Sequence, residues 1–565
     1  MPIRLSGINS GLDTDAIVKE LVSAYSLKTE KYEKQQTKLE WKQDAWKGLN
    51  TKIYGFYTNM SNLRFESAYN LKKTTLSDSS KATVTAASGA VTGTQKLNVL
   101  QTAQASYITG GYIGEEVTAS STLKDLGYTG GNTSIKVRDS EGKDTVIEIN
   151  AEMKISDLIS KFKDAGINAN FDSNNNRIFL SAKESGAAGD FDLVAENSEA
   201  YSVLSTLGLA SKEDAVEELK RQANEYNKLY AENESLKAVV DPDDETKARL
   251  EELKEKLGSF GADVRAVAAG KKAEDVVNDE NLATKITGQD AIIKLNGVQF
   301  TSSTNTFQVN GLTIEAQALT GEKDEDAVTI NTTVDTQGIY DKIKDFFTEY
   351  NNVINEITKL YNAESAKDYE PLTDEEKDSM SDEQIEKWED KIKSALLRRD
   401  NSLGNVMNAM VNSMSQSYEI DGQKLSLSNF GISTLGFLNA AENEQYAFHI
   451  DGDEDDENTS GKKDKLMAAI QENPDQIMKF MQKLTSNLYT AIDDKMKSTE
   501  LSSAYKVYND KEMDKEAKEI ENLIKKWNDK IAEQEDAYFK KFSQMEVALS
   551  KLQSQTNSLS GLLGQ

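Results

Sequence analysis

The sequence contains no cysteine among its 565 residues. This absence excludes disulfide bonds, cysteine-ligated zinc, iron–sulfur clusters and thiol catalysis. It contains one histidine, His449, so a Ser-His-Asp triad or a histidine metal site would depend on that single side chain. His449 lies in an alternating stretch, 446–450, that reads as a strand and has no nucleophile motif beside it. We interpret His449 as structural, and we expect no enzyme, cofactor or metal site.

Long apolar runs are also missing. No run of 18 apolar residues occurs, which argues against a transmembrane helix, and residues 1–7 lack the apolar core of a secretory signal. That start fits either a cytosolic protein or a protein exported without a cleaved signal. The formal net charge is −29. Because so acidic a chain repels nucleic acid and anionic lipid, neither is an expected partner, and membrane insertion is not expected.

The acidic run 451–457 looks at first like a calcium loop. An EF-hand loop needs glycine at its sixth position and glutamate at its twelfth. Counted from Asp451, those positions hold Asp456 and Lys462. We therefore interpret the run as a solvated acidic turn.

The N-terminal part of the chain has apolar or aromatic residues at every seventh position from Val18 to Met60. This period predicts a supercoiling helix, about 70 Å long over residues 18–63, with a start signal at Asp13–Asp15. A narrow seam of this kind requires a partner helix. The seam residues predicted to make contacts are Val18, Leu21, Tyr25, Tyr32, Leu39, Trp46 and Ile53.

The C-terminal part repeats the pattern, and residues 511–556 contain neither proline nor glycine. The predicted contact residues of this second helix are Ile531, Tyr538, Met545, Leu549, Leu552, Leu559 and Leu563. The simplest partners for the two terminal helices are each other and further copies of the chain. A coiled-coil spacer is the plainer alternative, but it does not explain the folded material between the two helices.

The middle of the chain changes period. Alternating apolar residues predict strands near 76–110 and hairpins over 133–149 and 171–180. Two Asn-Gly pairs, at Asn296-Gly297 and Asn310-Gly311, are signals for type I′ turns between strands. Helical spacing returns at 212–257, which we interpret as an inserted helical hairpin, and again after Asp335.

The predicted fold class is therefore multidomain α+β, with long coiled-coil helices at both termini, a helical bundle and inserted β-rich domains. The predicted domains are a terminal coiled coil (1–38 and 525–565), a helical bundle (39–76 and 335–524), a β-rich domain (77–110 and 283–334) and a second α+β domain (111–282) that contains the 212–257 hairpin.

Several motifs resemble the bacterial flagellar filament cap family, also called hook-associated protein 2. The start at Ser10–Val18 resembles the family's N-terminal motif. Residues 295–298, Asn305 and the stretch from Gly311 resemble its central motif, in which Asn296, Gly297, Asn305 and Gly311 would be structural turn residues. The stretch 369–377 resembles the Gram-positive version. The likeness covers about the first 110 residues and nearly everything after 285.

The resemblance implies a scaffold at the filament tip, without bond chemistry. Its terminal helices would form legs, and its β domains would form the plate beneath which flagellin folds and inserts. It also implies export through the flagellar type III apparatus without a cleaved signal, and a ring of five or six subunits. The implied partners are flagellin, the hook–filament junction protein and an export chaperone that covers the C-terminal seam.

Two alternatives stay open. The β domains could act as a surface adhesin that binds host mucin or carbohydrate, a role also assigned within this family. The chain could instead be another axial protein, either flagellin or a hook–filament junction protein, because these share the plan of helical termini.

Overall fold

The computed structural model describes residues 10–278 and 281–563, with side chains through Ser560. The chain folds into two compact units. The helical unit consists of Met1–Leu71 and Val334–Gln565, and the β-rich unit is Lys72–Thr333. The fold is thus multidomain α+β, as the sequence predicts. None of the helices in the described ranges is long and apolar enough to cross a membrane.

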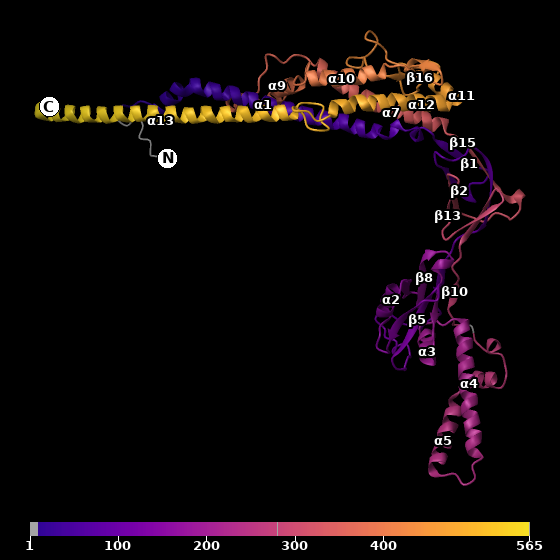
Figure 1. Cartoon of the computed structure of the whole chain (residues 1–565). Coiled ribbons are helices and arrows are strands. Elements are labelled where there is room, and N and C mark those ends of the chain that lie inside the picture. The colour runs from indigo at the N-terminus through magenta and orange to yellow at the C-terminus, as the bar shows by residue number, and fades with distance from the viewer. Residues whose placement is uncertain (1–9, 279–280, 564–565) are drawn as a thin grey trace. The chain divides into compact units, whose positions relative to one another are not determined.

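The helical unit is built mainly from α-helices, several of them long (Figure 1). The helices are α1 (Thr14–Met60), α7 (Thr336–Asn362), α8 (Asp374–Asp378), α9 (Asp382–Ser394), α10 (Asn401–Met414), α11 (Lys465–Glu472), α12 (Pro474–Met496) and α13 (Asp510–Leu563). Two small antiparallel ladders complete the unit: β16 (Tyr418–Ile420) with β17 (Gln423–Leu425), and β18 (Ile432–Ser433) with β19 (His449–Ile450).

Local signals in the sequence explain where several of these helices begin. The side chain of Asp13 caps α1 by accepting a hydrogen bond from the backbone N–H of Ala16. The spacings Thr373–Glu376 and Ser381–Gln384 both form complete capping boxes, at the starts of α8 and α9. Each cap satisfies backbone donors that the first turn of a helix leaves unpaired.

The core of the helical unit lies between the second half of α1 and helices α7, α10 and α12. The apolar face of α7 follows helical spacing, and its residues Ile343, Phe346 and Tyr350 are buried. The ring of Phe346 lies 6.1 Å from that of Phe56 on α1, measured between centroids. Tyr57 stacks on Tyr489 at 4.3 Å. Large aromatic rings therefore fix α1 against the bundle.

The β-rich unit contains two hydrophobic cores. Its strands are β1 (Lys72–Leu76), β2 (Ala82–Ala86), β3 (Gly93–Gln101), β4 (Ala105–Thr109), β5 (Thr133–Asp139), β6 (Asp144–Ile149), β7 (Asn168–Asp172), β8 (Arg177–Ser185), β9 (Phe191–Val194), β10 (Thr284–Ile286), β11 (Ala291–Leu295), β12 (Val298–Ser302), β13 (Thr306–Val309), β14 (Leu312–Ala316) and β15 (Val328–Val334). Its helices are α2 (Ile155–Asp164), α3 (Ser198–Thr206), α4 (Lys212–Lys237), α5 (Asp244–Ser259) and α6 (Ala262–Ala268).

The first core lies between a five-stranded sheet, ordered β1-β15-β3-β11-β12, and a three-stranded sheet, ordered β13-β14-β2. Leu97, Ile293 and Ile314 are among its fully buried side chains. The strand pairs β15–β3, β3–β11 and β11–β12 of the first sheet, and β13–β14 and β14–β2 of the second, are antiparallel. In the β11–β12 pair, for example, Leu295 lies opposite Val298. The alternation of buried and exposed residues along these strands is what the sequence predicts.

The second core lies among the sheets β10-β4-β8-β7 and β6-β5-β9 and the helices α2 and α3. Helix α2 buries Leu158 and Phe162 and ends before Gly166, whose φ of +95° suits glycine. Helices α4 and α5 occupy the residues for which the sequence predicts a helical hairpin, and Arg249 pairs with Glu232 across them at 2.8 Å.

The four domains predicted from the sequence are a finer division than these two units, and they stay a prediction. Two details of the structure bear on their limits. Strand β1, at 72–76, belongs to the β-rich unit. Strands β4 and β10, at 105–109 and 284–286, share one sheet with β7 and β8 and so contribute to the second core.

Candidate functional site: an assembly interface

Helices α1 and α13 pack along each other in opposite directions (Figure 1). Residues near the end of α1 contact residues near the start of α13, and residues near the start of α1 contact residues further along α13. The ring centroids of Trp46 and Tyr508 are 5.1 Å apart, and those of Tyr25 and Trp527 are 6.3 Å apart. At the far end, the backbone N–H of Ser10 donates to a carboxylate oxygen of Glu546 at 3.3 Å. The two termini therefore form one antiparallel pair within a single chain.

Asn50 holds the point where the chain enters this pair. Its amide donates to the backbone oxygen of Tyr505 at 3.1 Å and accepts from the backbone N–H of Val507 at 2.9 Å. Its side chain is only 4% exposed. An isolated asparagine inside a helical pattern gives no sign of this role in the sequence, because its partners lie more than 450 positions away.

The predicted N-terminal seam lies mainly inside this pair. Val18, Leu39, Trp46 and Ile53 are buried, Tyr25 and Tyr32 are half-buried, and Leu21 is 44% exposed. The buried members belong to the interior of one chain and are not a free surface. Contact between subunits therefore stays a prediction, and among these residues it is best supported for Leu21, which is more exposed than the half-buried Tyr25 and Tyr32.

Lys28 and Lys42 of α1, which follow Leu21 at multiples of seven residues and so interrupt the apolar seam, also have partners. The ammonium group of Lys28 lies 4.5 Å from the centre of the Trp527 ring, and that of Lys530 lies 4.9 Å from it. Lys42 forms an ion pair with Asp400 at 2.9 Å. Cations above an indole ring are attracted to its negative face. These contacts help to hold α1 where its apolar seam is interrupted.

The predicted C-terminal seam divides into two parts. Ile531, Tyr538, Met545 and Leu549 are half-buried, whereas Leu552 and Leu559 are 58% and 61% exposed. The side chain of Leu563 lies outside the described residues. The division follows from geometry, because α1 begins at Thr14 while α13 continues past Glu546. Residues 547–563 form a projecting end of α13, which we call the overhang (Figure 1).

The Asn-Gly motif residues build tight turns. Asn296 and Gly297 have φ values of +48° and +84°, and Asn310 and Gly311 have +52° and +78°. Positive φ at both central positions is the signature of a type I′ turn, so the predicted turns are confirmed. The side chain of Asn305 accepts from the backbone N–H of Ala103 at 2.6 Å, which fixes the loop between β12 and β13.

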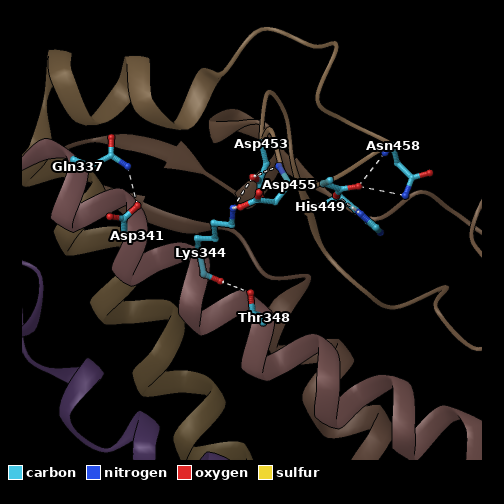
Figure 2. Close-up of polar contacts among 9 residues, drawn as sticks. Gln337, Asp341, Lys344, Thr348, His449, Asp453, Asp455 and Asn458 are labelled. Carbon is cyan, nitrogen blue, oxygen red and sulfur yellow. Dashed lines mark hydrogen bonds and ion pairs between the residues drawn. The ribbon is translucent and has the colours of Figure 1, made fainter.

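The acidic run 451–457 forms a turn in which Glu454, Asp455 and Glu457 are exposed, as the sequence predicts, but part of it is also tied to the bundle. Asp453 and Asp455 each contact the ammonium group of Lys344 on α7 at 2.6 Å (Figure 2). These hydrogen bonds raise the pKa of Lys344, although burial alone would lower it. Within the described residues, no group of three or more acidic or histidine side chains is arranged to hold a metal ion.

His449 lies beside the same loop. Its Nδ1 and the Asp456 Oδ2 are 2.6 Å apart. Burial alone would raise the pKa of Asp456, but the hydrogen bond with His449 lowers it below its ordinary value. Both residues line a polar hollow of about 420 Å³ beside α7. The arrangement fits the structural role predicted for this histidine, and the sequence gives no hint of its partner.

Comparison with known proteins identifies relatives along most of the chain. Residues 10–106 match the family model described as "Flagellar hook-associated protein 2 N-terminus", and residues 288–554 match "Flagellar hook-associated protein 2 C-terminus". Two curated proteins named flagellar hook-associated protein 2 are similar along most of their length. The one from Halalkalibacterium halodurans is 23% identical, over 89% of this chain and 83% of its own. The one from Thermotoga maritima is 24% identical, over 99% of this chain and 96% of its own.

Solved structures are also similar at low identity. The D1-D2-D3 domains of the flagellar cap protein of Escherichia coli give a TM-score of 0.45 at 15% identity, covering 79% of this chain and 95% of that chain. The structure of FliD (HAP2) from Pseudomonas aeruginosa gives a TM-score of 0.29 at 14% identity, covering 51% of this chain and 99% of that chain. The two family models, which match both ends of the chain, carry the assignment.

Proposed function

Because the chain belongs to the family of flagellar hook-associated protein 2 and caps the flagellar filament, we propose that its paired terminal helices are the leg by which each subunit holds the filament tip. As a cap it works outside the cell, at the end of the filament, where copies of the chain assemble and promote flagellin folding and insertion. The adhesin alternative has no support from the relatives found.

The finer proposals concern stoichiometry, partners and export. We propose a ring of five or six subunits that contacts flagellin and, when a filament begins, the hook–filament junction protein. We also propose export through the flagellar type III apparatus without a cleaved signal, after an export chaperone has covered the C-terminal seam. Such a protein acts through binding and folding and is not an enzyme.

The observation that supports contact through the leg is the exposure of the overhang. Leu552 and Leu559 lie seven residues apart, so they fall on nearly the same side of α13, and both are more than half exposed. Large exposed apolar side chains in a row are typical of a surface that another protein covers. The β-rich unit would then supply the plate.

A double substitution of these leucines tests the proposal in cells that lack their own cap. Leu552→Asp with Leu559→Asp places two charges on the apolar stripe and leaves the bundle core untouched. We expect short or missing filaments and loss of motility, because contacts through the leg fail. The matched control is Ser554→Asp, a single charge at a residue that is also exposed. Normal filaments in the double variant would overturn the proposed role of the leg.

The same variant tests the chaperone. An amphipathic helix binds a chaperone by laying its apolar face into a groove. We expect a pull-down from cytosol to recover less chaperone with the double variant than with Ser554→Asp. Equal recovery would place the chaperone site elsewhere on the chain.

A further inference from the structure

The overhang differs in composition from the rest of its own helix. Roughly half of residues 510–546 are charged, whereas residues 547–563 contain one charged side chain, Lys551. All the residues from 551 to 560 are exposed in the single chain. A solvated helix normally carries charge around most of its surface. A stretch that is both exposed and nearly free of charge indicates burial in an assembly.

The apolar residues of the overhang also keep a strict spacing, which continues from Met545 just before it. Met545, Leu549, Leu552, Thr556 and Leu559 follow alternating steps of four and three residues. This spacing is the seam of a coiled coil and is narrower than the stripe of a helix that packs on a globular core. The antiparallel partner within the chain stops short of it, since α1 begins at Thr14 and Ser10 already contacts Glu546.

The positions that flank this seam are compatible with an identical helix as the partner. In a coiled coil these positions select partners through their charges, and like charges keep identical helices apart. In the overhang they are held by uncharged residues: Ala548, Gln553, Gln555, Ser560 and Leu562. The last charged residue beside the seam is Glu546, which is 8% exposed and contacts Ser10 of its own chain. Identical copies of the overhang can therefore lie side by side without repulsion.

We propose that the overhangs of neighbouring copies of this chain pack on one another as a parallel, in-register coiled coil. The inference rests on the proposed leg function and names the partner of that surface. Copies related by a rotation axis point the same way, so a ring favours parallel helices. In register, the Thr556 side chains meet in one layer, where their hydroxyl groups can pair with each other. Out of register, each hydroxyl would face leucine.

The absence of cysteine in the natural chain permits a direct test. The full chain is purified with Leu552→Cys or with Leu559→Cys, assembled and oxidised. In a parallel, in-register coil the same seam position of two helices lies within disulfide reach, so each variant should give a cross-linked dimer. The matched control is Ser554→Cys, whose position lies away from the seam. It should give no dimer above the background of the chain without cysteine.

Two outcomes overturn the inference. The first is no dimer at Leu552→Cys and Leu559→Cys, or equal dimer at Ser554→Cys. The second concerns the double variant Leu5→Cys with Leu552→Cys. If it forms a cross-link within one chain while Leu552→Cys alone gives no dimer, residues 1–9 and not a second copy occupy the seam. Filament growth by the reduced variants in cap-less cells is measured in parallel. Normal growth without cross-linking rejects the coiled coil alone, whereas normal filaments from the Leu552→Asp and Leu559→Asp double variant would overturn the leg itself.

Discussion

The two parts of α13 show how one helix can serve two environments. Residues 510–546 are rich in charge and lie against α1, with Met513 and Ile520 buried. Residues 547–563 are nearly free of charge, and two of their leucines, Leu552 and Leu559, are more than half exposed. Charge thus accompanies the part whose apolar side is already covered within the chain. It is missing where the apolar side is still uncovered.

This difference separates stability from assembly. The paired part should determine the free energy of unfolding of the helical unit, because its apolar side chains are removed from water in the single chain. The overhang should contribute little to that free energy and much to association. Each prediction below changes one part and compares the result with the other.

The largest expected effect is on the paired part. Trp46→Ala removes a side chain that is 1% exposed and stacks on Tyr508. We expect it to lower the free energy of unfolding of the helical unit by about 3–5 kcal/mol. Chemical denaturation, followed by circular dichroism at low protein concentration, measures the change. The comparison variant Leu559→Ala should cost less than about 0.5 kcal/mol. Similar losses in the two variants would break the distinction between the parts.

Asn50→Ala should have the next largest effect. It leaves the backbone oxygen of Tyr505 and the backbone N–H of Val507 without their partner at the start of the pair. A buried polar group without a partner costs about 1–3 kcal/mol, so we expect a loss of that order in the same unfolding measurement. Asn59→Ala is the control, because Asn59 is exposed on the same helix. Equal losses would mean that Asn50 does not hold the start of α13.

Acid should weaken the paired part and leave the overhang unaffected. Burial alone would raise the pKa of Asp510, but the backbone N–H of Ser503, which donates to its carboxylate at 2.7 Å, lowers it. A lowered folded pKa means that the carboxylate stabilises the fold above its ordinary pKa of about 3.9. That contribution is lost as the pH falls through the folded value.

The measurement is the unfolding free energy between neutral and acid pH. Asp510→Asn should reduce the fall in stability in that range. A chain that ends at Glu546 should keep the full fall, because the charged residue it loses, Lys551, does not titrate in acid. An unchanged pH dependence in Asp510→Asn would show that protonation of this carboxylate does not contribute to the loss of stability in acid.

Local signals made much of the fold predictable. The Asn-Gly turns, the capping boxes and the heptad spacing each act within a few residues, so the sequence reveals them directly. The Lys344–Asp453 contact and the Asn50 contacts join residues more than 100 positions apart, and no local pattern marks them. The register of α1 on α13 is of the same kind. Without it, Val18 and Leu552 look like equal members of two seams, although one is buried and the other is exposed.

The most direct test of the account compares the full chain with a chain that ends at Glu546, by native mass spectrometry at one concentration. We predict that the full chain forms ring-sized oligomers, and that the shortened chain is mainly monomeric with an unchanged unfolding transition of its helical unit. Oligomers of the same size and abundance from both chains would contradict the central claim that the overhang is the part of the leg that requires a second copy.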